Sequence, residues 1–149
     1  MKERRQYLLS RSEEETERIG RELAADLPPG TLITLDGPLG SGKTVLAGAI
    51  AEGRGVPRTQ VQSPTYVILR QYTTGNILIY HWDLYRIATA DELATADFPE
   101  LLRDPSALTI IEWASLFPSL WEDHLPRVEI TLSEGAIHAK RRIGTRFVD

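Results

Sequence analysis

The sequence has no cysteine and no long apolar run. The absence of cysteine excludes disulfides and thiolate metal sites, and it agrees with a reducing compartment. A transmembrane helix would need about 18 consecutive apolar residues, and the basic residues 1–10 lack the apolar segment of a secretory signal. We therefore expect a soluble, cytoplasmic protein that does not contact a membrane.

Positive charge is also scarce. The 17 lysines and arginines stand against 21 aspartates and glutamates, which gives a net charge of −4. Proteins that hold nucleic acid through its phosphates gain most of that affinity from clustered cations. We therefore expect any connection to RNA to run through a partner protein.

The chain leaves little room for a second folding unit. Its 149 residues, of which 42% are apolar, are enough for one sizeable hydrophobic core. No internal repeat or low-complexity stretch divides the sequence. We predict a single domain that spans residues 1–149.

The segment at 37–44, GPLGSGKT, fits the phosphate-binding pattern G-x-x-x-x-G-K-[ST]. Its glycines let successive backbone N–H groups face a polyphosphate, Lys43 adds a positive charge, and Thr44 offers a hydroxyl to Mg²⁺. A β-rich run at 31–36 precedes it and a helix-forming run at 45–50 follows, so the helix dipole would point at the phosphates. A glycine turn without a ligand is the alternative. The predicted nucleotide-binding residues are Gly37, Pro38, Leu39, Gly40, Ser41, Gly42, Lys43 and Thr44.

Hydrophobic periodicity and turn residues predict strands and helices around this loop. Ser12 and Glu15 form a capping box for a helix that ends before Pro28. Turn residues at 73–76 predict a hairpin, whose antiparallel strands would make the sheet mixed. The fold class is therefore α/β with a mixed, mostly parallel central sheet. We expect strands at 6–9, 31–36, within 61–72, and at 77–83, 107–112, 127–132 and 136–148, and helices at 12–27, 44–54, 90–103 with a break at Pro99, and 116–124.

Two carboxylates stand at the ends of apolar strands. Asp83 closes ILIYHWD and Glu112 closes ALTIIE, and in open α/β sheets ligands bind at the carboxyl ends of the strands. Hard oxygen ligands suit Mg²⁺, and a carboxylate at this place can also orient an attacking water. The alternatives are a turn or helix-cap role for Asp83 and a rim position for Glu112.

Three further residues near these strands have open roles. Thr65 follows Ser63-Pro64, in the segment where nucleotide switches place a hydroxyl that senses Mg²⁺ and the γ-phosphate. A plain turn before a strand is the alternative for Thr65. His81 lies on the opposite pleat face from its two neighbours, and we expect it to pack rather than to react. Core packing, an adenine platform and a partner contact are all open for Trp113.

Other classes of nucleotide-binding protein lack their motifs here. Asn76 is the only asparagine, so the Asn-Lys-x-Asp motif that reads guanine is absent, and no Asp-x-x-Gly follows the hairpin. A small-molecule kinase needs a substrate-binding region and an arginine-bearing lid, for which little chain remains. The residues therefore favour a compact ATPase or a nucleotide-sensing module.

Several motifs together resemble the TsaE family of small bacterial ATPases in tRNA threonylcarbamoyladenosine biosynthesis. They are the phosphate loop, SPTYVILRQY at 63–72, HWDLYR at 81–86 and the pair Glu112-Trp113, in matching order and spacing over nearly the whole chain. The resemblance implies a P-loop NTPase-like three-layer fold that binds ATP or ADP with Mg²⁺. It also implies a role as the ATPase partner of the two-protein transferase assembly of the TsaD and TsaB families, with tRNA contacted only indirectly.

The same resemblance implies a role for each site residue. Lys43 would hold the β- and γ-phosphates, and Thr44 and Glu112 would bind Mg²⁺. Asp83 would support hydrolysis, and Thr65 would be the switch hydroxyl. Hydrolysis, slow without the partner, would reset the transferase complex between turnovers. The alternative is a module that senses the nucleotide and regulates assembly without useful hydrolysis.

Parts of the chain depart from the family pattern. Pro38 and Ala114 replace residues that are usual at these positions, but neither change removes a ligand. The C-terminal segment at 138–149 matches only loosely. Its basic residues could face nucleotide, partner, tRNA or solvent.

Overall fold

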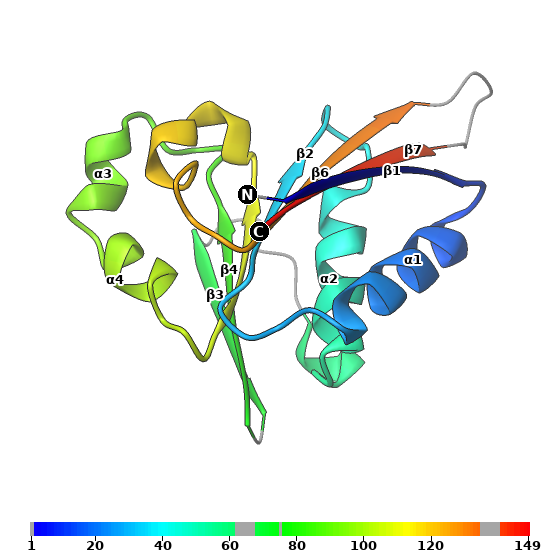
Figure 1. Cartoon of the computed structure of the whole chain (residues 1–149), viewed down its shortest axis with the longest axis horizontal. Helices are drawn as coiled ribbons and strands as arrows, with labels where there is room; N and C mark the ends of the chain where they lie inside the picture. The colour runs from blue at the N-terminus through cyan, green and yellow to red at the C-terminus, as the bar shows by residue number, and fades with distance from the viewer. Residues whose placement is uncertain (1, 62–67, 75, 135–140) are drawn as a thin grey trace.

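The computed structural model describes residues 2–61, 68–74, 76–134 and 141–149 (Figure 1). Within these ranges the strands are β1 (Glu3–Ser10), β2 (Leu32–Asp36), β3 (Leu69–Thr74), β4 (Ile77–Asp83), β5 (Leu108–Glu112), β6 (Arg127–Glu134) and β7 (Arg141–Val148). The helices are α1 (Glu13–Ala25), α2 (Lys43–Gly53), α3 (Ala90–Ala94) and α4 (Phe98–Leu102), with 3₁₀ turns η1 (Arg58–Gln60), η2 (Ala114–Leu116) and η3 (Pro118–Leu120). None of these described helices is both long enough and apolar enough to cross a membrane.

The strands form one sheet in the order β1-β7-β6-β2-β5-β4-β3. The four central strands run parallel through the pairs β6–β2, β2–β5 and β5–β4. The outer strands run antiparallel through the pairs β1–β7, β7–β6 and β4–β3. The predicted mixed sheet is confirmed, and its parallel part is confined to the centre, where the phosphate-binding motif follows β2. β7 is the described part of the strand predicted at 136–148.

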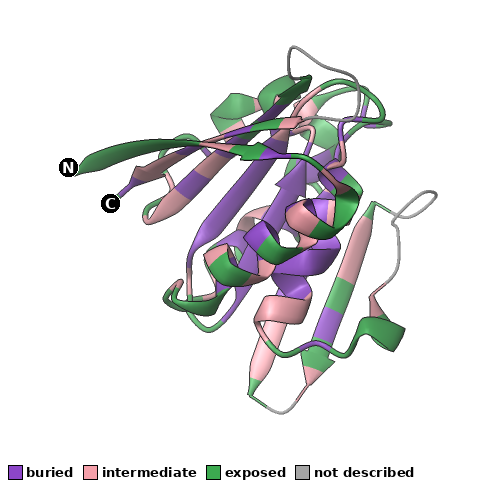
Figure 2. Cartoon of the chain, turned by 90° about the vertical axis from the view of Figure 1, so that its right-hand side faces the viewer, coloured by how far each residue is buried: buried purple, intermediate pink, exposed green. Residues whose placement is uncertain are grey.

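Helices cover both faces of the sheet, which confirms the predicted three layers (Figure 1). α1 and α2 lie on one face, and α3, α4 and the η2–η3 segment lie on the other. The central strand β2 is buried on both sides, because Ile33 packs into the α1–α2 cluster and Leu32 into the cluster that contains Phe98 of α4. Burial therefore follows the strands through the middle of the molecule (Figure 2), as expected for parallel strands covered on both faces.

Two expected helices differ from the structure. Residues 90–103 form the two short helices α3 and α4, and Pro99 lies in the first turn of α4 instead of breaking a helix. Proline is tolerated there because the first-turn N–H groups have no partner within the helix. Residues 116–124 lie in the 3₁₀ segments η2 and η3 and the turn that follows them, rather than in an α-helix. The buried Trp121 indole N–H donates to the Ala114 carbonyl oxygen at 2.8 Å, which holds this segment in its tight turns.

The start of α1 follows the prediction closely. The Ser12 hydroxyl accepts a hydrogen bond from the Glu15 N–H at 3.1 Å, so the predicted cap is confirmed. The Glu15 carboxylate turns back to the N–H of Arg11 at 2.6 Å, one residue before the expected partner. β1 is longer than the strand predicted at 6–9 because it pairs with β7 along its whole length.

α1 packs against α2 at two glycines. A Cβ on Gly20 of α1 would stand 2.8 Å from the Ala49 Cβ, and a Cβ on Gly53 would stand 2.5 Å from the carbonyl oxygen of Arg21. Backbone atoms in a packed interior cannot move aside as the end of a flexible side chain can. This close approach fixes the position of α2, whose N-terminus carries the phosphate-binding motif.

Replacing Gly53 by alanine tests this close approach. Alanine favours a helix by about 1 kcal/mol over glycine, but overpacking against the Arg21 backbone costs about 1–3 kcal/mol. Because a contact of 2.5 Å with backbone atoms puts the overpacking cost in the upper part of this range, we expect Gly53→Ala to lower the free energy of unfolding in urea by about 1–2 kcal/mol. Arg18→Ala, at an exposed position of α1, is the control and should change stability by less than about 0.5 kcal/mol. A Gly53→Ala protein as stable as the parent would show that the helices have room to separate.

Candidate functional site

The carboxyl ends of β2, β4 and β5 meet the N-terminus of α2 at one end of the sheet. The loop after β2 enters α2 through Gly42, whose backbone is left-handed with φ at 100°. Glycine adopts this conformation readily, and it brings no side chain to cap the first N–H groups of the helix. These N–H groups and the helix dipole are therefore available to an anion.

The Lys43 side chain lies across this loop. Its Nζ donates to the carbonyl oxygens of Gly37 at 2.6 Å and Pro38 at 2.8 Å, and it stands 4.1 Å from the centroid of the Trp113 ring. Burial lowers the pKa of Lys43, and Glu112 is the nearby carboxylate that opposes this shift most. The ammonium group is thus held by neutral carbonyls, which an anion can replace as the stronger partner.

Glu112 joins three elements through its two carboxylate oxygens. Oε1 accepts a hydrogen bond from the Thr44 hydroxyl of α2 at 3.1 Å, and Oε2 lies 2.7 Å from Nε2 of His81 on β4. Glu112 is only 1% exposed and His81 only 2%. Glu112 is therefore a buried group of the site and not a rim acid.

His81 is buried, as the sequence predicts. Its contact with Glu112 was not predicted from the sequence. His81 and Asp83 lie two residues apart on β4, so their side chains project from the same face of the sheet. Asp83 was expected at the site. The alternation of side chains along β4 therefore indicates from the sequence that His81, two residues before Asp83, faces the site as well. The sequence-based expectation of a packing role for His81 rested only on its position on the opposite pleat face from its two neighbours.

Asp83 ends β4 directly beside Glu112, its partner in the parallel register. Its Oδ1 accepts a hydrogen bond from the Tyr85 N–H at 3.0 Å, so the turn role that the sequence left open is present. Burial raises the pKa of Asp83, the bond from Tyr85 opposes that shift, and the negative charge of Glu112 adds to it. Asp83 thus combines a turn contact with a place beside the buried carboxylate.

Two further residues reach the site: Trp113, whose role the sequence left open, and Asp36, which the sequence-based expectations did not include. Trp113 has a left-handed backbone with φ at 60°, and its ring lies against Lys43 and the Tyr85 ring, with 4.8 Å between the two ring centroids. Asp36, at the end of β2, accepts a hydrogen bond from the Ser115 N–H at 2.9 Å. Trp113 therefore forms a wall of the site beside Lys43.

The described oxygen donors fit Mg²⁺ bound together with a nucleotide. Among the residues that the structure describes, no three His, Cys, Asp or Glu side chains gather into a metal site. Mg²⁺ usually takes one or two carboxylates and completes its coordination with waters and substrate phosphates. The Thr44 hydroxyl and the Glu112 carboxylate, at the N-terminus of α2, are oxygen donors of this kind. Thr65 lies outside the described residues, so its switch role stays a prediction.

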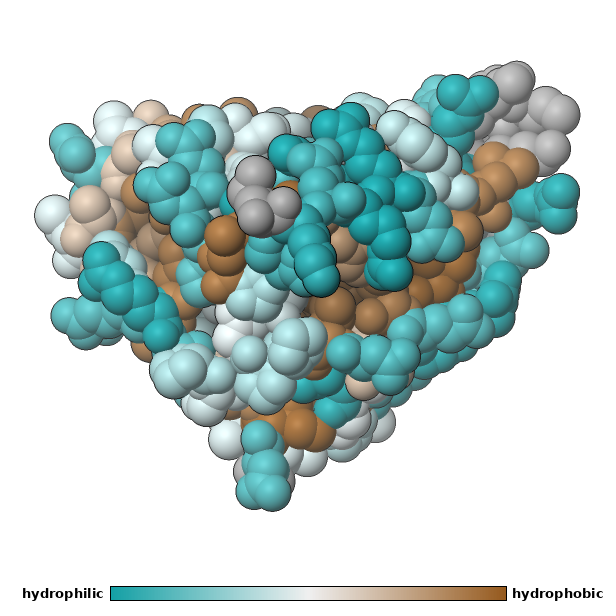
Figure 3. Space-filling view, viewed as in Figure 1, coloured by the Kyte–Doolittle hydropathy of each residue, from teal (hydrophilic) through white to brown (hydrophobic). Residues whose placement is uncertain are grey.

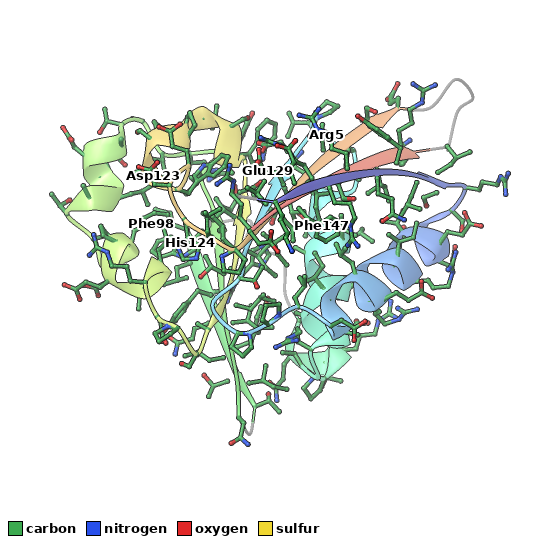
Figure 4. All side chains as sticks on the ribbon, viewed as in Figure 1. Arg5, Phe98, Asp123, His124, Glu129 and Phe147 are labelled. Carbon is green, nitrogen blue, oxygen red and sulfur yellow. The ribbon has the colours of Figure 1, made fainter. Side chains whose placement is uncertain are left out.

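A separate hollow lies at the other end of the sheet, near the amino ends of β2 and β6. Its volume is about 650 Å³, and Leu27, Val128 and Phe147 are among the residues that line it. Apolar surface shows between the β1–β7 strands and α1 in this part of the molecule (Figure 3). Phe147 lies on the α1 side of the sheet, away from Phe98 (Figure 4). The described site residues do not line this hollow.

Sequence comparisons relate the chain to known proteins. The family model described as "Threonylcarbamoyl adenosine biosynthesis protein TsaE" matches residues 10–143. The chain is 35% identical over 125 residues to the tRNA threonylcarbamoyladenosine biosynthesis protein TsaE of Rickettsia felis, covering 84% of this chain and 71% of that protein. It is 36% identical over 119 residues to the protein of the same name from Bacillus subtilis, covering 80% of this chain and 70% of that protein.

A solved structure shares the fold. The crystal structure of YdiB from Bacillus subtilis matches with a TM-score of 0.73 and 27% identity, covering 100% of this chain and 89% of that chain. The predicted P-loop NTPase-like α/β fold is confirmed by this likeness together with the sheet topology.

Asp83 offers a pH-dependent test of the site geometry. Because burial raises the pKa of Asp83 above its value in the unfolded chain, the ionised carboxylate lowers stability at neutral pH, and this penalty disappears once the pH falls below the unfolded pKa. In Asp83→Asn the amide oxygen still accepts the Tyr85 N–H. We expect Asp83→Asn to raise Tm at pH 7 without nucleotide, and the gain to vanish by about pH 3.5. A Tm difference that stays constant between these pH values would contradict the burial of this carboxylate.

Proposed function

Because the chain belongs to the TsaE family of threonylcarbamoyl adenosine biosynthesis proteins, we propose that it is the ATPase of this tRNA modification. It binds ATP or ADP with Mg²⁺ at the loop formed by residues 37–44. The observation that carries the proposal is the hydrogen bond between Thr44 and Glu112. This bond brings a hydroxyl and a buried carboxylate together beside the uncapped N–H groups of α2.

Each described site residue has a role in this proposal. The N–H groups of the loop and Lys43 bind the β- and γ-phosphates. Mg²⁺, when bound, offsets the negative charge of the phosphates and orients them for in-line attack. Thr44 and Glu112 hold the metal ion. Asp83 positions the attacking water, and its raised pKa suits a group that accepts a proton.

Lys43 changes partners when the nucleotide binds. In the structure its Nζ is bonded to the carbonyl oxygens of Gly37 and Pro38. A phosphate oxygen carries negative charge, so its hydrogen bond with the ammonium group is roughly twice as strong as a bond to a neutral acceptor. The Trp113 ring remains beside the ammonium group as a wall that excludes water from one side.

Turnover depends on the partner proteins. The chain works with transferase proteins of the TsaD and TsaB families, and hydrolysis resets their complex between turnovers. An arginine that reaches the transferred phosphate is typically worth about 10³–10⁵ in rate. Arg86 is a weak candidate for this role, and we propose that a partner protein supplies the arginine, so that the isolated protein hydrolyses ATP slowly. Contact with tRNA runs through the transferase, in agreement with the net charge of −4.

Release of phosphate from ATP tests the proposed activity. We expect slow release by the chain alone and release at least about 10-fold faster when both transferase proteins of the same organism are present. ADP and phosphate should account for all the ATP consumed. If ATP binds but no phosphate is released in any mixture, the protein is a nucleotide-sensing module and not an ATPase. If a small molecule becomes phosphorylated instead, the protein is a kinase.

Two substitutions separate nucleotide binding from hydrolysis. Lys43→Ala should weaken ATP binding by about 10- to 100-fold, because the phosphates lose a charged hydrogen-bond donor. Asp83→Ala should leave ATP bound and lower turnover by at least about 10²-fold. Asp91→Ala, at an exposed position in the first turn of α3, is the control and should match the parent in both measurements. Normal hydrolysis by Asp83→Ala would assign the positioning of water to another group.

A further inference from the structure

We propose that His81 is a positioning residue that fixes Glu112 in the orientation needed to bind Mg²⁺. The inference rests on the proposed function, because it concerns the metal ion of the nucleotide site. His81 touches neither the metal ion nor the nucleotide. It acts through its contact with Oε2 of Glu112.

His81 and Glu112 lie on neighbouring parallel strands, with their side chains on the same face of the sheet. In the register of β4 and β5, Asp83 is opposite Glu112 and His81 is opposite Ile110. His81 therefore stands two residues earlier than Glu112 along the common strand direction, nearer to the core. From there the imidazole reaches forward until its Nε2 lies 2.7 Å from Oε2.

Both oxygens of Glu112 have a hydrogen-bond partner. A carboxylate that binds Mg²⁺ only accepts hydrogen bonds, so in that role Glu112 needs Nε2 of His81 to carry the hydrogen in one of them, and the Thr44 hydroxyl donates in the other. The side chains of His81 and Glu112 are each 2% exposed, so water cannot replace a lost partner. Rotation of the carboxylate would leave the buried Nε2–H of His81 unpaired. With His81 in place, Glu112 keeps Oε1 directed at Thr44.

His81 is itself held by packing from β3. The Tyr72 ring is 5% exposed, and its centroid lies 6.4 Å from that of the imidazole, with the two rings tilted by 36°. β3 pairs with β4 so that Tyr72 is opposite Ile79, diagonal to His81. A continuous row of contacts therefore runs from Tyr72 through His81 and Glu112 to Thr44 at the start of α2.

The orientation of the Glu112 carboxylate affects how tightly Mg²⁺ binds. The ion requires near-octahedral geometry at short distances, so a carboxylate that rotates freely presents its oxygen correctly for only part of the time. Hydrogen-bond partners of metal ligands are typically worth about 10- to 100-fold in metal affinity or activity. His81 occupies the place of such a partner.

The Mg²⁺ dependence of ADP binding tests this role without relying on activity. Calorimetric titrations with ADP are run over a range of Mg²⁺ concentrations, with EDTA as the metal-free reference. His81→Leu removes the donor and keeps an apolar side chain of similar size, whereas His81→Gln keeps an amide N–H near the place of Nε2. Ile79→Val, at a fully buried position two residues earlier on the same strand face, is the control for loss of packing.

We expect His81→Leu to raise the Mg²⁺ concentration for half-maximal ADP binding by about 10- to 100-fold. The metal-free affinity for ADP should change by less than about 2-fold, because the loop and Lys43 are intact. His81→Gln should stay near the parent, and Ile79→Val should lower Tm without moving the Mg²⁺ midpoint. In a Glu112→Gln background His81→Leu should have no further effect, because His81 acts only through Glu112.

An unchanged Mg²⁺ midpoint in folded His81→Leu protein would overturn the inference and leave the proposed function intact. If the parent chain does not bind ADP under any condition, both the proposed function and the role of His81 are wrong. If His81→Leu does not fold, His81→Gln and His81→Asn decide the question, because the asparagine side chain is too short to reach Oε2. The inference then requires a normal midpoint for His81→Gln and a raised one for His81→Asn, and equal midpoints would overturn it.

Discussion

The buried carboxylate of Glu112 is the contact on which the arrangement of the site depends. Its two oxygens join β5 to the Thr44 hydroxyl on α2 and to His81 on β4. The bond to His81 is buried, so a shift of β4 against β5 would leave a buried polar group unpaired, at a cost of about 1–3 kcal/mol or more. The bond to Thr44 is only partly buried. The phosphate loop is thereby fixed at both ends, by β2 before it and by Glu112 after it.

The central parallel strands of the fold place this carboxylate. β2, β4 and β5 run parallel, so that their carboxyl ends meet at one edge of the sheet, and the N-terminus of α2 arrives at the same edge. The close approach of α1 and α2 at Gly20 and Gly53 fixes the position of the helix from the other side. The antiparallel strands β1, β7 and β3 extend the sheet at its edges. The site therefore depends mainly on the central parallel strands, and β3 adds the contact of Tyr72 with His81.

Local patterns explain why much of the fold and part of the site could be predicted from the sequence. The strand, loop and helix around 37–44 are encoded in adjacent residues, and strand ends were enough to bring Asp83 and Glu112 together. The bond between His81 and Glu112 depends on register and side-chain rotamers, which packing between distant segments decides. The helix expected at 116–124 was wrong because a buried tryptophan hydrogen bond holds this segment in 3₁₀ turns. Sequence periodicity does not report such a contact.

A crystal structure with a non-hydrolysable ATP analogue and Mn²⁺ in place of Mg²⁺ is the most direct test, because anomalous scattering locates the metal ion. We expect the ion at the Thr44 hydroxyl with Glu112 in its coordination sphere. We also expect Lys43 to contact phosphate instead of the carbonyl oxygens of Gly37 and Pro38. A metal ion bound away from Thr44 and Glu112, or a Lys43 that keeps its loop contacts with the nucleotide in place, would contradict the site described above.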